Sequence, residues 1–272
     1  MDRKINNEKI MISICPVSNI KKTCKNSPKI SFKGVQPQEP LGVYDYVVYR
    51  QAKSDAKKIL DSKRDVIRIS KIENQRAQSI INSQIKKVQF AIEQTPERIK
   101  CRDGKTYMVD SFTGRLSHVT YFKQADDGIK IDRIDVVNSD STKDVIIADE
   151  NNKVRNIHKN FRQIAPNSFI EDCGYQFKDG VLKSRNGALS YVNDGNARER
   201  VDTRENVYRF SDGQLISFYP KTSCAGKDFS ATRIYKFSDE KLVRYAEDYT
   251  KSESGEVDFS KNYQYSDYNI FI

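Results

Sequence analysis

The eight residues YQFKDGVL at positions 175–182 return as YRFSDGQL at 208–215, YKFSDEKL at 235–242 and YQYSDYNI at 263–270. In each copy two aromatic residues alternate with polar ones, an aspartate follows, and an aliphatic residue ends the pattern. A two-residue type I′ loop at Asp179-Gly180 would place Phe177 directly across from Leu182 in a β-hairpin. Because side chains alternate along a strand, Tyr175, Phe177 and Leu182 would then form one apolar cluster.

The copies begin 33, 27 and 28 residues apart, and internal repeats at such periods are typical of arrays. Two weaker copies, Val109–Leu116 and Ile147–Val154, keep the seven-residue spacing with Thr113-Gly114 and Asn151-Asn152 at the turn. The turns at Asp239-Glu240 and Asp267-Tyr268 lack the glycine that tolerates positive φ, so we expect longer loops there. We also expect the third and fourth copies to bury Phe237 against Leu242 and Tyr265 against Ile270.

Further turn signals at Asp103-Gly104, Asp127-Gly128 and Asp194-Gly195 separate other strand-like runs. Short loops join antiparallel neighbours, so we predict an antiparallel β-meander of repeated hairpins over residues 98–272. Over roughly residues 99–272 the chain resembles tandem β-hairpin repeat proteins of the MORN-like kind, which also pair an aromatic residue with a glycine turn. The resemblance implies a scaffold or a binding surface for protein or lipid, and it implies no catalytic residues.

A helical segment is predicted over residues 43–97. No Gly or Pro occurs from Tyr44 to Thr95, good helix formers dominate from Gln51 onward, and Pro96 ends the run. One face carries an apolar stripe, but a strict coiled-coil seam would need apolar residues at four positions that are polar, namely Lys63, Ser70, Glu73 and Gln84. Three arrangements stay open: the helix lies along the β-domain, folds back near Asp61-Ser62, or pairs with another chain.

Residues 1–42 are predicted to form a disordered basic arm, because they contain four prolines, many Lys, Asn and Ser, and no lasting hydrophobic period. Within the arm, Ile30–Gly34 is a possible short strand or docking peptide. Lys and Arg number 8 against 3 acids in residues 1–43, 12 against 7 in 44–98, and 27 against 27 in 99–272. The positive surplus is therefore confined to the first 98 residues. With a helical segment followed by an antiparallel sheet, the expected fold class of the whole chain is α+β.

The residue types that carry chemistry are few and scattered. Five cysteines, at positions 15, 24, 101, 173 and 224, form no Cys-x-x-Cys pair, which favours free thiols over disulfides or a zinc site. A Cys/His pair drawn from Cys101, Cys173, His118 and His158 would be needed for a hydrolase. Gly226-Lys227 lacks the upstream glycine of a P-loop. We therefore assign no catalytic, metal or cofactor residues, and binding residues stay unknown.

These patterns favour a non-enzymatic protein-interaction or scaffold module that uses the repeated hairpin surface. The first alternative is binding of nucleic acid or an anionic membrane through the basic residues 1–98. The second alternative is the Cys/His hydrolase. No apolar run approaches the ~20 residues of a transmembrane helix, and no cleavage pattern of a secretory signal follows the run at Ile10–Ile14. We therefore expect a cytoplasmic protein, with export as the alternative.

Overall fold

The computed structural model describes residues 43–112, 114–193 and 201–264. Contacts between residues divide the chain into two compact units, Met1–Val48 and Tyr49–Ile272. Of the first unit only residues 43–48 are described, and they are helical. The second unit holds the remainder of that helix and the whole β-sheet. The predicted basic arm and the fourth repeat after Gln264 lie outside the described residues.

One unbroken helix, α1 (Val43–Gln94), accounts for the predicted helical segment. It ends where Pro96 begins a single 3-10 turn, η3 (Pro96–Arg98), because proline cannot donate the backbone hydrogen bond that would continue the helix. The helix does not fold back at Asp61-Ser62. Within the described residues, no helix combines the length and the apolar character needed to span a bilayer.

All strands belong to one sheet, and every pairing in it is antiparallel. The predicted meander is therefore confirmed. The strands are β1 (Ile99–Arg102), β2 (Lys105–Phe112), β3 (Arg115–Ala125), β4 (Gly128–Val137), β5 (Lys143–Ala148), β6 (Val154–Ala165), β7 (Ser168–Glu171), β8 (Cys173–Lys178), β9 (Val181–Asn186), β10 (Leu189–Val192), β11 (Val201–Ser211), β12 (Gln214–Ala225), β13 (Asp228–Ser238), β14 (Lys241–Lys251), β15 (Val257–Asp258) and β16 (Lys261–Gln264).

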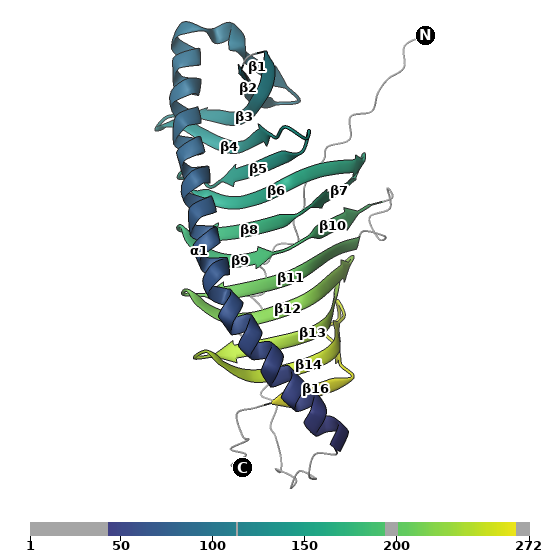
Figure 1. The fold of residues 1–272 in the computed structure, drawn as a ribbon. Coiled ribbons are helices and arrows are strands. Elements are labelled where there is room, and N and C mark those ends of the chain that lie inside the picture. The colour runs from purple at the N-terminus through teal and green to yellow at the C-terminus, as the bar shows by residue number, and fades with distance from the viewer. Residues whose placement is uncertain (1–42, 113, 194–200, 265–272) are drawn as a thin grey trace, which may run out of the picture. The chain divides into compact units, whose positions relative to one another are not determined.

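Two positions in the sheet are each filled by two short strands placed end to end. β7 and β8 both pair with β6, and β9 and β10 both pair with β11. β8 pairs with β9, and β7 pairs with β10. The chain therefore crosses this part of the sheet in the order β7, β8, β9, β10, as one broken hairpin (Figure 1).

The repeated octapeptides form the hairpins that their spacing predicts. Phe177 lies opposite Leu182, Phe210 opposite Leu215 and Phe237 opposite Leu242. The first five of these side chains are buried, and Leu242 is half-buried. In each hairpin the register shifts just before the second aromatic residue, so one residue of the returning strand bulges out, as Ile216 does with 43% exposure.

The third turn differs from the expectation of a longer loop. Ser238 pairs with Lys241, so Asp239-Glu240 is a two-residue loop, and both residues adopt positive φ, 49° and 61°. Glu240 holds this conformation without glycine while its carboxylate forms an ion pair with Lys63 of α1. The turn sequence alone does not favour this strained backbone conformation, and a contact with a distant helix accompanies it.

The two weaker copies behave differently from each other. Leu116 lies opposite Ser111, which is the predicted register, but Leu116 is 44% exposed and adds no buried cluster. Val154 lies opposite Ala148 across a longer loop that Asp149 and Lys153 close through a backbone hydrogen bond.

From Tyr49 onward, α1 crosses the strands on one face of the sheet (Figure 1). Asp55 accepts a hydrogen bond from Tyr235 of β13, and Lys87 pairs with Asp110 of β2. These 32 residues rise about 48 Å, while the nine strand-to-strand steps from β13 to β2 span about 43 Å. The helix therefore runs nearly perpendicular to the strands, inclined by about 25°.

One set of sheet-facing residues of α1 repeats every seven positions, and we call it the seam. All its members are buried: Tyr49, Ala56, Lys63, Ser70, Ala77, Gln84 and Ala91. Beside the seam lie four further buried residues, Ala52, Ile59, Ile81 and Val88. Polar seam residues have partners, since Thr120 donates to Gln84 at 3.0 Å and Ser70 donates to the Ile67 carbonyl at 2.8 Å. Of the three arrangements left open by the sequence, the helix along the β-domain is the one observed.

Enlarging a seam residue should destabilise the fold. Ala77 is 3% exposed where α1 meets β4–β6, so Ala77→Leu should lower the free energy of unfolding by about 1–3 kcal/mol. Gln75 lies on the exposed side of the helix, and Gln75→Leu should change it by less than about 0.5 kcal/mol. Urea unfolding monitored by circular dichroism measures both; equal effects would contradict the seam.

The hairpin cluster gives a second stability test. Phe210 is 4% exposed, so Phe210→Ala should cost about 3–5 kcal/mol in urea unfolding. Exposed Ser211 is the matched control, and Ser211→Ala should stay within about 0.5 kcal/mol. Arg209, on the other side of Phe210, is no control, because its half-buried side chain lies over the Tyr219 ring at 5.0 Å. A loss below 1 kcal/mol for Phe210→Ala would refute the buried pair.

Candidate interaction surface

A line of backbone irregularities crosses the sheet from β6 to β14. Asn160, Asn206 and Asp248 lie within strands yet have positive φ, and both broken strands are interrupted at the same level. The Asp172 amide donates to the Lys159 carbonyl, and the Gly187 amide donates to the Glu205 carbonyl. Because neighbouring strands deviate together, the sheet bends along this line, and the strands visibly curve (Figure 1).

The bend closes on the face that α1 does not cover. One apolar cluster joins residues from both sides of the line: Val207, Tyr219, Ala231, Ile234 and Ala246, with Phe229 and Tyr249 packed against it. The Tyr219 and Phe229 rings meet edge to face at 5.9 Å, although ten residues of chain separate them. Side chains on opposite sides of a bend converge only on its inner side.

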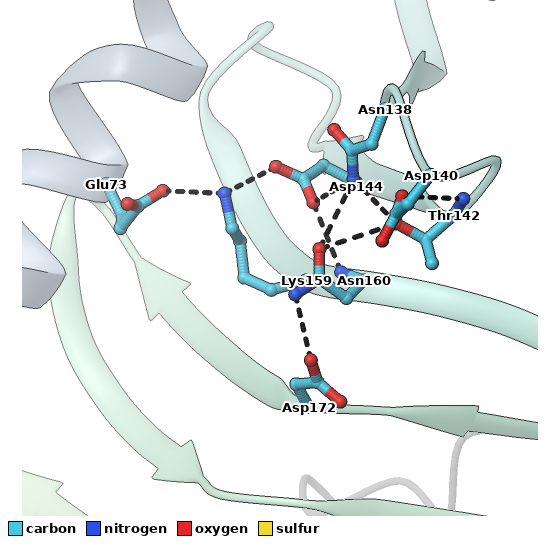
Figure 2. Close-up of polar contacts among 8 residues, drawn as sticks. All are labelled: Glu73, Asn138, Asp140, Thr142, Asp144, Lys159, Asn160 and Asp172. Atoms are coloured by element: carbon cyan, nitrogen blue, oxygen red, sulfur yellow. Dashed lines mark hydrogen bonds and ion pairs between the residues drawn. The ribbon is translucent and has the colours of Figure 1, made fainter.

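A polar network holds the bend at β6 (Figure 2). Asp144 accepts hydrogen bonds from the Asn160 backbone amide at 3.1 Å and from the Asn138 side chain at 3.2 Å. The Asn160 side chain donates in turn to Asp172 at 2.8 Å. Thr142 caps the neighbouring turn by donating to Asp140 at 2.7 Å. An asparagine tolerates the left-handed conformation better than most residues, and these contacts select that conformation at position 160.

Lys159 ties this network to α1. Its ammonium lies between Glu73 of the helix, at 3.3 Å, and Asp144 of β5, as Figure 2 shows. Burial alone would raise the pKa of Asp144, but the hydrogen bond and charge of Lys159 and the amide donors outweigh it and lower that pKa. The recess beside these residues has room for about one water molecule and not for a larger ligand. The network therefore connects α1 to the sheet, and we call it the Asp144 joint.

The opposite face of the same strand segment carries a second cluster. Ile157 and Lys159 face α1, so Asn156 and His158 point to the other side of the sheet. His158 Nδ1 lies 2.5 Å from Glu171 Oε2, and the Asn186 side chain donates to Glu171 Oε1 at 3.1 Å. The Glu171 side chain is 1% exposed, so its neighbours shield it almost completely.

Cross-strand neighbours extend this cluster over several strands. Leu189 lies opposite both Glu171 and Arg204, and Tyr191 lies opposite both Phe169 and Asp202. Directly opposed residues share a face. Arg204 donates two hydrogen bonds to Asp202, at 3.0 and 2.7 Å, which satisfies the buried Asp202 carboxylate.

Three aromatic rings stand beside these polar groups. The Phe169 ring lies 4.9 Å from that of Phe161 and stacks on that of Tyr191 at 4.8 Å, and all three side chains are half-buried. We call the following residues the inner surface: Asn156, His158, Phe161, Phe169, Glu171, Asn186, Tyr191, Asp202 and Arg204. It combines three adjacent aromatic rings with polar side chains that hydrogen bonds hold in place.

One polar atom of the inner surface is left unsatisfied. Asn156 is 7% exposed, and its side-chain oxygen has no hydrogen-bond partner among the described residues. A buried carbonyl oxygen without a donor costs roughly 1–3 kcal/mol. The atom is enclosed by its neighbours, so this cost belongs to the fold, and the accessible part of the inner surface is formed by the half-buried rings.

The structure separates the four residues of the Cys/His hypothesis. Cys101 is exposed on β1, His118 is in β3, and His158 is bound to Glu171. Cys173 is opposite Lys159, on the face away from His158, and burial raises the pKa of its thiol, which disfavours the thiolate. Gly226-Lys227 forms the hairpin turn between β12 and β13. Within the described ranges, no group of three or more His, Cys, Asp or Glu residues is arranged to hold a metal.

Sequence reasoning assigned no binding residues and so missed the inner surface. The sequence holds one signal for it, the isolated Gly174 inside a strand. Such a glycine often marks a place where another group approaches the backbone closely. A Cβ atom at Gly174 would lie 2.6 Å from both the Glu171 carboxylate and the Asn186 side-chain oxygen. The glycine leaves the space that the carboxylate occupies.

Comparison with known proteins gives no family for this chain. No protein-family model matches it, and no curated protein matches it at a significant level.

The Asp144 joint predicts a pH dependence. Because the pKa of Asp144 is lowered in the fold, its contribution to stability is present above the unfolded value of about 3.9 and is lost as the pH falls through the folded pKa. Asp144→Asn should therefore flatten the decline in the free energy of unfolding below about pH 4. Urea titrations between pH 2 and 7 measure this, with exposed Asp132→Asn as the control; parallel curves would contradict the joint.

Proposed function

We propose that this chain is a non-enzymatic interaction module that binds a protein partner on the inner surface. The observation that carries the proposal is the group of three half-buried aromatic rings, Phe161, Phe169 and Tyr191, on the sheet face that α1 leaves uncovered. The polar groups of that surface other than the Asn156 oxygen already have partners, so they contribute a fixed shape.

The composition of the inner surface suits a protein partner. Aromatic side chains and arginine are enriched at protein interfaces, where rings fill pockets and supply most of the binding energy. Apolar side chains of an extended partner segment would cover Phe161 and Phe169. The bend brings these groups together, since they come from β6 and β7.

Site-specific crosslinking tests the proposal. Gln163 is exposed and lies opposite Phe169, so a photo-crosslinking amino acid at position 163 should capture a discrete partner protein in cells. The same probe at exposed Gln75 of α1 is the control and should not capture that protein. With the purified partner, Phe169→Ala should raise Kd roughly 30-fold or more, as expected for a central aromatic contact.

A second variant guards against partial unfolding of Phe169→Ala. Gln163→Arg adds bulk and charge at the rim without removing a buried side chain, and it should also weaken binding. If neither variant changes Kd, or if position 75 captures the same protein as efficiently, the inner surface is not the binding site.

A further inference from the structure

Basic side chains line the exposed side of α1. Lys57, Arg64 and Lys71 are exposed and seven residues apart, so they stand in one row at intervals of about 10.5 Å. Seven more exposed basic residues lie on the described part of the same helix: Arg50, Lys53, Lys58, Arg68, Arg76, Lys86 and Lys87. Each row residue directly follows a seam residue in the chain, so the row lies about 100° around the helix from the seam, on an exposed flank.

Acidic residues of α1 do not neutralise this row. Asp55 accepts a hydrogen bond from Tyr235, and Glu73 pairs with Lys159, so both carboxylates are directed toward the sheet. Asp65 is exposed and pairs with Arg68 at 3.2 Å. Within the described residues no salt bridge involves Lys57, Arg64 or Lys71. Two exposed acids, Asp61 and Asp65, lie on this stretch of the helix, and five exposed bases outnumber them, namely Lys57, Lys58, Arg64, Arg68 and Lys71, so the outer face is net positive.

Two large apolar side chains interrupt the positive face. Ile69 is 42% exposed and Ile72 is 51% exposed, three residues apart and therefore adjacent on the helix surface. Ile69 directly follows Arg68, and Ile72 directly follows Lys71 in the chain. Exposed aliphatic residues among lysines and arginines are typical of helices that lie in the interface of an anionic bilayer.

We propose that the outer face of α1 binds the surface of an anionic lipid membrane, with Ile69 and Ile72 inserted into the interface and Lys57, Arg64 and Lys71 reaching lipid headgroups from the flank of the helix. The isoleucines favour a bilayer over a nucleic acid, because exposed aliphatic side chains find apolar surroundings among lipids and have no role against a phosphate backbone.

Vesicle sedimentation of the full chain tests the proposal. Vesicles of phosphatidylcholine with 30% phosphatidylserine should sediment the protein, and pure phosphatidylcholine vesicles should not. The triple variant Lys57→Gln, Arg64→Gln, Lys71→Gln should lower the partition coefficient roughly fivefold for each charge, about 100-fold in all. The matched control Lys105→Gln, Lys221→Gln, Lys251→Gln removes three exposed charges from the sheet and should retain wild-type binding.

Two further variants separate the possible results. The charge-conserving variant Lys57→Arg, Arg64→Lys, Lys71→Arg should bind like wild type, and Ile69→Gln with Ile72→Gln should weaken vesicle binding while leaving binding to a 20-base-pair DNA duplex unchanged. The proposal is overturned if the two charge-removing triple variants bind vesicles equally, or if the helix variant loses affinity for the duplex but not for the vesicles. All variants alter exposed residues, and their melting temperatures should match wild type.

Discussion

The fold depends on a match between the rise of a helix and the spacing of strands. Seven residues of α-helix rise about 10.5 Å, and two steps across a sheet cover about 9.6 Å. A slightly inclined helix therefore turns the same side to the sheet once for every hairpin. The match depends on the number of strands that the helix crosses and not on their length. Hairpin units that begin 33, 27 or 28 residues apart can therefore all pack against a seam with a constant seven-residue period.

Polar seam residues set the position of the helix along the sheet. Lys63 pairs with Glu240, and Gln84 accepts a hydrogen bond from Thr120. Gln78, next to the seam residue Ala77, donates to the Asn152 carbonyl. These partners lie on three different parts of the sheet. Sliding α1 by one heptad would bury these groups without partners, at a cost of several kcal/mol. An all-apolar seam would bind as strongly at several positions. The residues that argue against a coiled coil are thus those that specify one arrangement on a sheet.

Local pattern was enough to predict most of the fold, because a hairpin depends on residues close in sequence. Tyr208, Phe210 and Leu215 lie within eight residues, so alternation and turn chemistry place them together. The Asp239-Glu240 turn differs from the expected longer loop because both residues adopt positive φ without a glycine, which residue preferences alone do not favour. The inner surface was missed for another reason: His158, Glu171 and Asn186 form no local motif, and they meet only through the register of separate strands. The MORN-like resemblance stays a prediction.

The bend was the least predictable feature, since Asn160, Asn206 and Asp248 resemble any turn-forming residue until the strands are aligned. Its position in β6 also couples the two faces of the sheet. Asp144 binds both the Lys159 ammonium and the Asn160 amide. The Asp144 carboxylate therefore binds Lys159, which pairs with α1, and it also holds the left-handed conformation of Asn160. The next residue, Phe161, contacts the Phe169 ring. The contacts that fix α1 on β6 and those that shape the inner surface therefore share the Asp144 carboxylate.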